Sequence, residues 1–167
     1  MAKDRTEVAR EILRVLYARP GFLIRRAHQI TEGLFADMAG SLNITPTQFG
    51  ALTVVSALEP IDQISLARAL GLDRSTTGLV VANLESRGLI TRTTDPGDRR
   101  RRVLATTAEG RDMLQRITVV AREVQDVTLE IFDEQERRTF LALLAKLVDR
   151  FNASVRTPLI TDPAELS

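Results

Sequence analysis

Apolar residues along most of the chain recur every three to four positions, which predicts a mainly helical protein. The clearest stripe lies between Phe22 and Met38, where Leu23, Ile30 and Leu34 fall on one face of a helix. Seven helices are expected on this pattern. They span about residues 6–17, 22–38, 46–58, 64–70, 75–87, 108–131 and 134–153.

Residues that favour helix ends stand at several of these boundaries. Three helix starts have the pattern of a capping box, in which a capping side chain and a residue three positions later satisfy each other's backbone N–H groups. The pairs are Thr45 with Gln48, Thr106 with Glu109, and Asp133 with Glu136. Asp62 and Asp73 are expected to cap the two short helices between them, and Gly71 and Gly88 to end those helices.

The pattern changes between residues 88 and 108. Residues 89–94 and 101–106 favour β-structure, and the Asp-Pro-Gly-Asp sequence at 95–98 between them is typical of a tight turn. The sequence therefore predicts a helix-turn-helix over residues 62–88 followed directly by a β-hairpin. This order of elements is that of a winged helix, which reads DNA.

The long amphipathic helices at 108–131 and 134–153 exceed what so small a lobe can cover. A second copy of the chain is the expected cover, and the alternative is that the first helices cover them within one chain. The chain is accordingly treated as one unit of 167 residues. Its expected parts are dimerisation helices at about 6–44 and 108–155, a DNA-binding lobe at 45–106, and an irregular tail at 156–167.

The net charge is only +1, from 23 basic and 22 acidic residues, so the total argues for no partner. The distribution of charge along the chain is more informative. Residues 87–102 hold six arginines and two aspartates, a local net charge of +4 that indicates a binding surface for a polyanion. Lys3 and Lys146 are the only lysines, so 21 of the 23 basic residues are arginine. Arginine suits phosphates and guanine edges, although a coding sequence rich in G and C would give the same bias.

These features predict contacts with double-stranded DNA from two elements. The second helix of the helix-turn-helix presents its first turn, and the hairpin presents its tip. The candidate residues are Arg74, Ser75, Thr76, Thr77, Arg92, Asp98, Arg99, Arg100 and Arg101. Asp98 is expected to hold the guanidinium of Arg100 so that it enters a minor groove. The alternative is that the basic run is only a solvated surface.

The sequence lacks the residues that several other classes of function require. The absence of cysteine excludes disulfides, Cys-ligated zinc and thiol redox sensing, and the single histidine argues against a His-rich metal site. No Gly-rich phosphate loop is present, and a catalytic Ser-His-Asp set would have to use His28. We expect no enzyme activity, metal or cofactor. Residues 1–7 do not resemble a signal peptide and no stretch predicts a membrane span, so a cytoplasmic protein is expected.

Three segments carry a resemblance to the MarR (multiple antibiotic resistance regulator) family. They are LARALGLDRST at 66–76, LESRGLITR at 84–92 and DRRRRVLATTAEG at 98–110, and the resemblance extends over about residues 10–152. It implies homodimers that bind pseudo-palindromic operators and usually repress. Arg100 matches the family's wing-tip arginine and Asp98 its paired acid. Many members carry a polar or basic residue where this chain has Gly78, so base contacts are expected only in the first helical turn.

The family's effectors are typically small aromatic anions held between the dimer helices and the DNA-binding lobe. Residues 17–29 resemble members that repress the catabolism of nicotinate or related aromatic acids, and a cation and a titratable donor beside apolar walls suit a ring carboxylate. The candidate ligand residues are Phe22, Arg25, Arg26, His28 and Phe49. Two alternatives stay open: His28 lies at a helix edge or a dimer interface, or the protein is a constitutive architectural or protein-interaction module without an effector.

Overall fold

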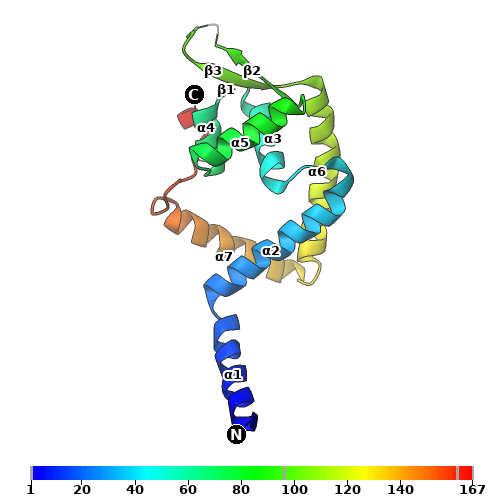
Figure 1. The fold of residues 1–167 in the computed structure, drawn as a ribbon, viewed down its shortest axis with the longest axis vertical. Coiled ribbons are helices and arrows are strands. Elements are labelled where there is room, and N and C mark those ends of the chain that lie inside the picture. Colours follow the sequence, from blue (N-terminus) through cyan, green and yellow to red (C-terminus); the bar gives the residue numbers. More distant parts are fainter. Residues whose placement is uncertain (1, 96, 161, 167) are drawn as a thin grey trace.

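The computed structural model describes residues 2–95, 97–160 and 162–166, so Pro96 of the predicted turn lies outside the described residues. All seven predicted helices are present, and two short 3-10 helices, η1 and η2, join them (Figure 1). The bounds are α1 Ala2–Tyr17, α2 Pro20–Ala39, η1 Gly40–Leu42, α3 Pro46–Leu58, α4 Gln63–Leu70, α5 Arg74–Ser86, α6 Ala108–Leu129, α7 Glu134–Asn152 and η2 Pro163–Leu166.

The predicted hairpin is confirmed as β2 (Ile90–Thr94) and β3 (Arg102–Thr106), which pair antiparallel with Arg92 opposite Leu104. The structure adds a third strand, β1 (Ile61–Asp62), on the other side of β3, with Ile61 opposite Leu104. The sequence did not predict β1, because two residues are too few to show an alternating pattern. β1 leads directly into α4, so the sheet joins the wing to the helix-turn-helix.

The hydrophobic core lies where α3, α4 and α5 pack against the sheet and against α2 and α6. Its most deeply buried large apolar side chains come from α3, α4, α5, the sheet and α6: Leu52, Val55, Leu66, Val81, Leu84, Ile90, Leu104 and Ile117. Helix α2 adds the buried Phe35 and Ala39. The charged wing thus stands on a closed apolar base formed within one chain.

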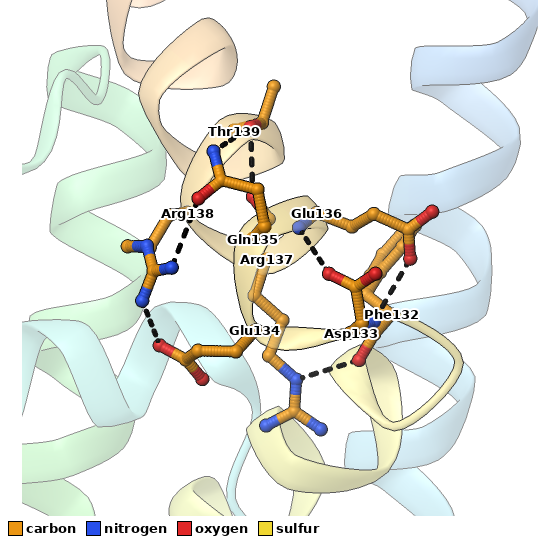
Figure 2. A network of polar contacts seen from close by, with 8 residues as sticks. All are labelled: Phe132, Asp133, Glu134, Gln135, Glu136, Arg137, Arg138 and Thr139. Carbon is orange, nitrogen blue, oxygen red and sulfur yellow. Dashed lines mark hydrogen bonds and ion pairs between the residues drawn. The ribbon is translucent and has the colours of Figure 1, made fainter.

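Two of the three predicted capping boxes are confirmed. At α3, Gln48 N–H donates to Thr45 Oγ1 over 3.2 Å, and Thr45 N–H donates to the Gln48 side chain over 3.0 Å. Figure 2 shows the box at α7, where the backbone N–H groups of Asp133 and Glu136 each donate to the other's carboxylate over 2.9 and 2.8 Å. Both helices begin where the sequence placed them.

The predicted box of Thr106 with Glu109 is wrong. Thr106 ends β3, and its backbone N–H donates to the Glu59 carboxylate. The cap of α6 is Thr107, whose Oγ1 accepts the N–H of Gly110 over 2.9 Å. The position that would carry the reciprocal side chain is therefore a glycine, and α6 has a single cap.

Gly110 is required where α6 starts, because the helix lies directly on the backbone at Leu89. A Cβ at this position would stand 1.9 Å from the Leu89 carbonyl oxygen and 2.8 Å from Thr106 Cγ2. Thr107 holds the same contact, since its N–H donates to the Leu89 carbonyl over 3.1 Å. The wing and the long helix are thereby joined without an intervening loop.

The described residues of the tail lie against the lobe, and outside η2 they lack regular structure, as predicted. Thr157 Oγ1 donates to the Gly71 carbonyl over 2.7 Å, and Ile160 N–H donates to the Arg68 carbonyl over 3.1 Å. The side chain of Asn152 donates to and accepts from the backbone of Leu159, both over 2.8 Å. The tail therefore ties the end of α7 to α4, beside which η2 (red in Figure 1) lies.

Helices α1 and α7 remain outside the core. α1 projects away from the rest of the molecule in Figure 1, and every described side chain of α1 is exposed. α7 has no buried residue, although an apolar stripe runs along it. Among the described residues, no helix is both long and apolar enough to cross a membrane.

Candidate nucleic-acid interface

Helices α4 and α5 form the predicted helix-turn-helix. Asp62 caps α4 by accepting the N–H groups of Ile64 and Ser65, and Asp73 caps α5 by accepting the N–H of Thr76 over 2.9 Å. Gly71 ends α4 with φ of +63°, a left-handed conformation that favours glycine. The hydrogen bonds from Thr76 to the Asp73 carboxylate hold the pKa of that group below its ordinary value, so it is a charged cap at neutral pH.

The first turn of α5 divides the four candidate residues into two pairs. Arg74 and Ser75 are exposed at the surface. Thr76 is half-buried and its hydroxyl donates to the Asp73 carboxylate over 2.8 Å. Thr77 is fully buried and its hydroxyl donates to the Asp73 carbonyl over 2.8 Å, so its side chain cannot contact a base. Its inclusion among the DNA contacts was wrong, because it shares the inward face of α5.

At the wing tip Asp98 acts on the backbone of Arg100. Its Oδ1 accepts the Arg100 N–H over 2.9 Å, and its own carbonyl accepts the Arg101 N–H over 2.9 Å. The described contact therefore shapes the turn and does not orient the Arg100 guanidinium, which differs from the expected pairing. Arg99 and Arg100 are exposed, and among the described residues no hydrogen bond or ion pair holds either guanidinium.

The Arg101 side chain, 41% exposed, binds Asp62 and fixes the wing to the helix-turn-helix. Its Nε donates to Asp62 Oδ2 over 2.9 Å, across 39 residues of sequence. Burial raises the pKa of Asp62, but the Ser65 N–H and the Arg101 guanidinium outweigh burial, so the pKa lies below its ordinary value. Asp62 thus caps α4 and anchors the wing at once. Arg101 holds the interface in shape and its guanidinium is already paired.

Arg92 is also engaged within the chain. It lies on β2 with its Nε 3.5 Å from a carboxylate oxygen of Glu85 on α5, and its side chain is 31% exposed. This ion pair joins the wing to the C-terminal part of α5. Of the nine candidate residues, Arg74, Ser75, Asp98, Arg99 and Arg100 are exposed. The Asp98 carboxylate is bound to the wing backbone, which leaves Arg74, Ser75, Arg99 and Arg100 as the exposed candidates for a DNA contact.

Four of the five candidate ligand residues lie in the first half of α2, where Phe22 is half-buried and Arg25, Arg26 and His28 are exposed. The Arg25 guanidinium stands 5.0 Å from the centroid of the Phe22 ring, and both Arg25 and Arg26 donate to the Gln29 side chain. His28 Nε2 is 3.6 Å from a carboxylate oxygen of Glu32, and the His28 side chain is 67% exposed. These residues form a polar surface and not an enclosed pocket in a single chain.

Phe49 is separated from that surface. It lies on α3, half-buried, with its ring stacked on Phe35 at 6.2 Å between centroids. Two surface cavities of about 250 and 270 Å³ are lined by other residues, the first by α2, α3 and α5 around Asn43 and Asn83, the second by the start of α7 around Phe140. Neither of these two cavities is lined by any of the five candidate residues.

Known proteins share this arrangement. A sequence profile of the MarR family matches residues 44–101, which span the helix-turn-helix and the wing tip. The transcriptional repressor NicR of Pseudomonas putida is 30% identical over 129 residues, which cover 77% of this chain and 82% of NicR. The chain belongs to the MarR family. It is a DNA-binding transcription regulator and not an enzyme.

Two solved structures extend the comparison to the fold of this MarR-family protein. The repressor CouR, bound to a 23-mer DNA duplex, is 30% identical with a TM-score of 0.75, covering 80% of this chain and 94% of CouR. BpsR of Bordetella bronchiseptica, whose DNA binding is regulated by 6-hydroxynicotinic acid, is 26% identical with a TM-score of 0.75, covering 80% of this chain and 95% of BpsR.

Proposed function

We propose that this MarR-family regulator is a homodimeric repressor that binds a pseudo-palindromic operator and is released from it by a small aromatic carboxylate. The observation that carries the proposal is the geometry of the lobe. The wing tip exposes Arg99 and Arg100, whereas Arg101 is paired with Asp62 and holds the wing against α4. A cationic tip on a fixed hairpin suits a narrow minor groove, while the first turn of α5 faces the major groove.

The DNA part is tested by replacing the exposed arginine. Arg100→Ala is expected to weaken operator binding by about 1–3 kcal/mol without changing the fold, because a surface contact is lost. Arg116→Ala, which removes the same charge from an exposed position of α6, is the matched control. A gel-shift titration at several salt concentrations measures both, and binding should weaken steeply with salt. Equal affinities for the wild type and Arg100→Ala would contradict the role of the wing.

The dimer part is supported by the exposed apolar stripes on α1 and α7. A two-fold dimer presents two reading lobes, which is what a palindromic operator requires. Sedimentation at micromolar concentration is expected to give about 37 kDa, twice the chain mass of 18.5 kDa. A monomer at that concentration would contradict the dimer and the palindromic operator together.

The effector part is supported by the likeness to NicR and to BpsR, whose DNA binding responds to 6-hydroxynicotinic acid. A ligand can release DNA only if it favours a dimer geometry that misfits the operator. DNA-release titrations with nicotinate-like and benzoate-like acids test this. His28→Ala should raise the acid concentration needed for release while operator affinity without acid is unchanged. No release by any of these acids would favour the module without an effector.

A further inference from the structure

Helix α5 presents one large apolar side chain to solvent. Leu79 is 72% exposed, whereas Val81 and Leu84 on the opposite face of the same helix are fully buried. Among residues 45–95 and 97–106, Leu79 and Ile64 are the only large apolar side chains that the structure leaves exposed. The lobe closes the rest of its apolar surface, so an exposed leucine in the middle of α5 is set apart from the pattern around it.

The other residues on this face of α5 are small or polar. At a helical period of 3.6 residues, the positions that share the outward face with Leu79 are Ser75, Thr76, Ala82, Asn83 and Ser86, all exposed except the half-buried Thr76. Asn83 is engaged with α3, since its Oδ1 accepts a hydrogen bond from Gln48 Nε2 over 2.9 Å. The small side chains on this face let the helix backbone approach a surface closely. Leu79 is the one large apolar side chain exposed on this face.

Gly78 does not belong to the outward face. A Cβ at residue 78 would stand 3.5 Å from Nε2 of Gln63 on α4, so this position faces the first helix of the helix-turn-helix. The expectation that base contacts end in the first turn was drawn from Gly78. The structure shows that the outward face continues into the second turn through Leu79.

The surroundings of this face favour DNA as its occupant. Arg74 is exposed beside Ser75 at the start of the helix, and the exposed wing-tip arginines belong to the same positively charged lobe. A leucine has no donor or acceptor for a base edge. The apolar group that a base presents in the major groove is the 5-methyl of thymine, which an apolar side chain can contact and which cytosine lacks.

We propose that Leu79 is a specificity-determining residue that reads the 5-methyl group of a thymine in each operator half-site. The inference rests on the proposed function, because it requires α5 to enter the major groove. It adds a base preference in the second turn of the helix to the phosphate and groove contacts of the arginines.

A methyl scan of the operator tests the assignment. The full-length protein first selects its operator from a random duplex library, and each thymine of the selected site is then replaced by deoxyuridine, which lacks only the methyl. For the wild type, each half-site should contain one thymine whose replacement, made alone, weakens binding about fourfold, which is the effect of one buried methyl group. For Leu79→Ala, the operators with thymine and with deoxyuridine at that position should bind equally.

Two further variants provide matched comparisons. Ile64→Ala removes the other exposed apolar side chain of the lobe and should retain the full methyl dependence. Leu79→Met keeps an apolar side chain of similar volume and should also retain it. Because Leu79 is exposed in the single chain, Leu79→Ala should unfold at the same temperature and sediment at the same mass as the wild type.

Several results would overturn the inference, and they differ from failure of the proposed function. If the wild type binds its operator with no loss at any deoxyuridine, or if Leu79→Ala keeps the same dependence, Leu79 does not read thymine although the protein binds DNA. If Leu79→Ala changes the sedimenting mass, Leu79 is a subunit contact. If the wild type selects no duplex at all, the proposed function fails and the inference fails with it.

Discussion

The DNA-binding lobe and the helices α1 and α7 contain the same apolar residue types, but the lobe buries most of them and the two helices leave them exposed. In the lobe, Leu52, Leu66 and Leu84 are fully buried within a single chain. Along α7, Leu144 is 41% exposed and Leu143 is 61% exposed, and no residue of the helix is buried. Helix α4 of the lobe and α7 have similar amphipathic patterns, so periodicity alone does not distinguish a core formed within the chain from a face that needs another surface.

The difference assigns separate roles to the two regions. The lobe closes its own core and can hold the wing and α5 in a fixed relation, which a reading surface needs. The apolar stripes of α1 and α7 are exposed in the described chain, and in the proposed dimer a second copy would supply a matching surface by symmetry. Substitutions in the lobe should therefore act on folding, and substitutions on α7 should act on association.

A pair of leucine truncations tests this difference with the largest expected effect. Leu84→Ala opens a cavity in a fully buried site and should lower the free energy of unfolding by about 2–5 kcal/mol. Leu144→Ala, the matched change on α7, should lower the free energy of unfolding of the single chain only slightly and should weaken the proposed dimer. Urea unfolding and sedimentation, each over a range of protein concentrations, separate the two.

The dependence on concentration decides the outcome. The loss of unfolding free energy for Leu84→Ala should be the same at low and high protein concentration. For Leu144→Ala, the loss of unfolding free energy should appear only at concentrations where the wild type is dimeric. If Leu144→Ala lowers the stability of the monomer by as much as Leu84→Ala, α7 is covered within its own chain and the comparison fails.

The junction of the two regions is tested at Gly110, where α6 lies on the Leu89 backbone. Gly110→Ala should lower the free energy of unfolding by about 1–3 kcal/mol, because the added methyl meets a backbone carbonyl that cannot move aside. Gly33→Ala in α2 is the control, since a Cβ there has nothing within 4 Å. The control should raise the free energy of unfolding by about 0.5–1 kcal/mol, because alanine has a higher helix propensity than glycine. A stable Gly110→Ala would mean that α6 can shift relative to the wing.

The sequence predicted the elements well because each helix carries its own period and its own end residues. It could also have placed Thr77 correctly, since Thr77, Val81 and Leu84 recur at the spacing of one buried face. The polar character of threonine obscured that pattern. The tight approach at Gly110 has no local pattern, because it depends on the path of β2 relative to α6.

The contacts that define the site are mostly distant in sequence, and local patterns do not report them. Arg101 binds Asp62 across 39 residues, so the basic run gave no indication that one of its members is paired. The same holds for the tail, where Thr157 reaches Gly71 across 86 residues. The exposure of Leu79 could not be predicted either, because an apolar residue in a helix is first assigned to the core.

The Asp62–Arg101 pair predicts a pH dependence of the lobe. Since the pKa of Asp62 is lowered in the folded protein, its contribution to stability is complete above the ordinary carboxyl range and is lost as the pH falls through the lowered pKa. Asp62→Asn keeps a capping oxygen but leaves Arg101 without its anion, and should cost about 1–2 kcal/mol at neutral pH. Urea unfolding from pH 7 to pH 3 should show a flatter dependence for this variant. Parallel curves for both proteins would contradict the role of the pair.

The smallest effect is expected where the tail joins the end of α7 to the lobe. Thr157→Val removes the hydrogen bond to the Gly71 carbonyl and should lower the free energy of unfolding by about 0.5–1 kcal/mol. It should also speed amide hydrogen exchange at Ile160, whose N–H donates to the Arg68 carbonyl next to that bond. Thr157→Ser keeps the hydroxyl and should exchange like the wild type. If Ile160 exchanges as fast in the wild type as in Thr157→Val, the tail moves independently of the lobe, and α7 is joined to the lobe only through α6.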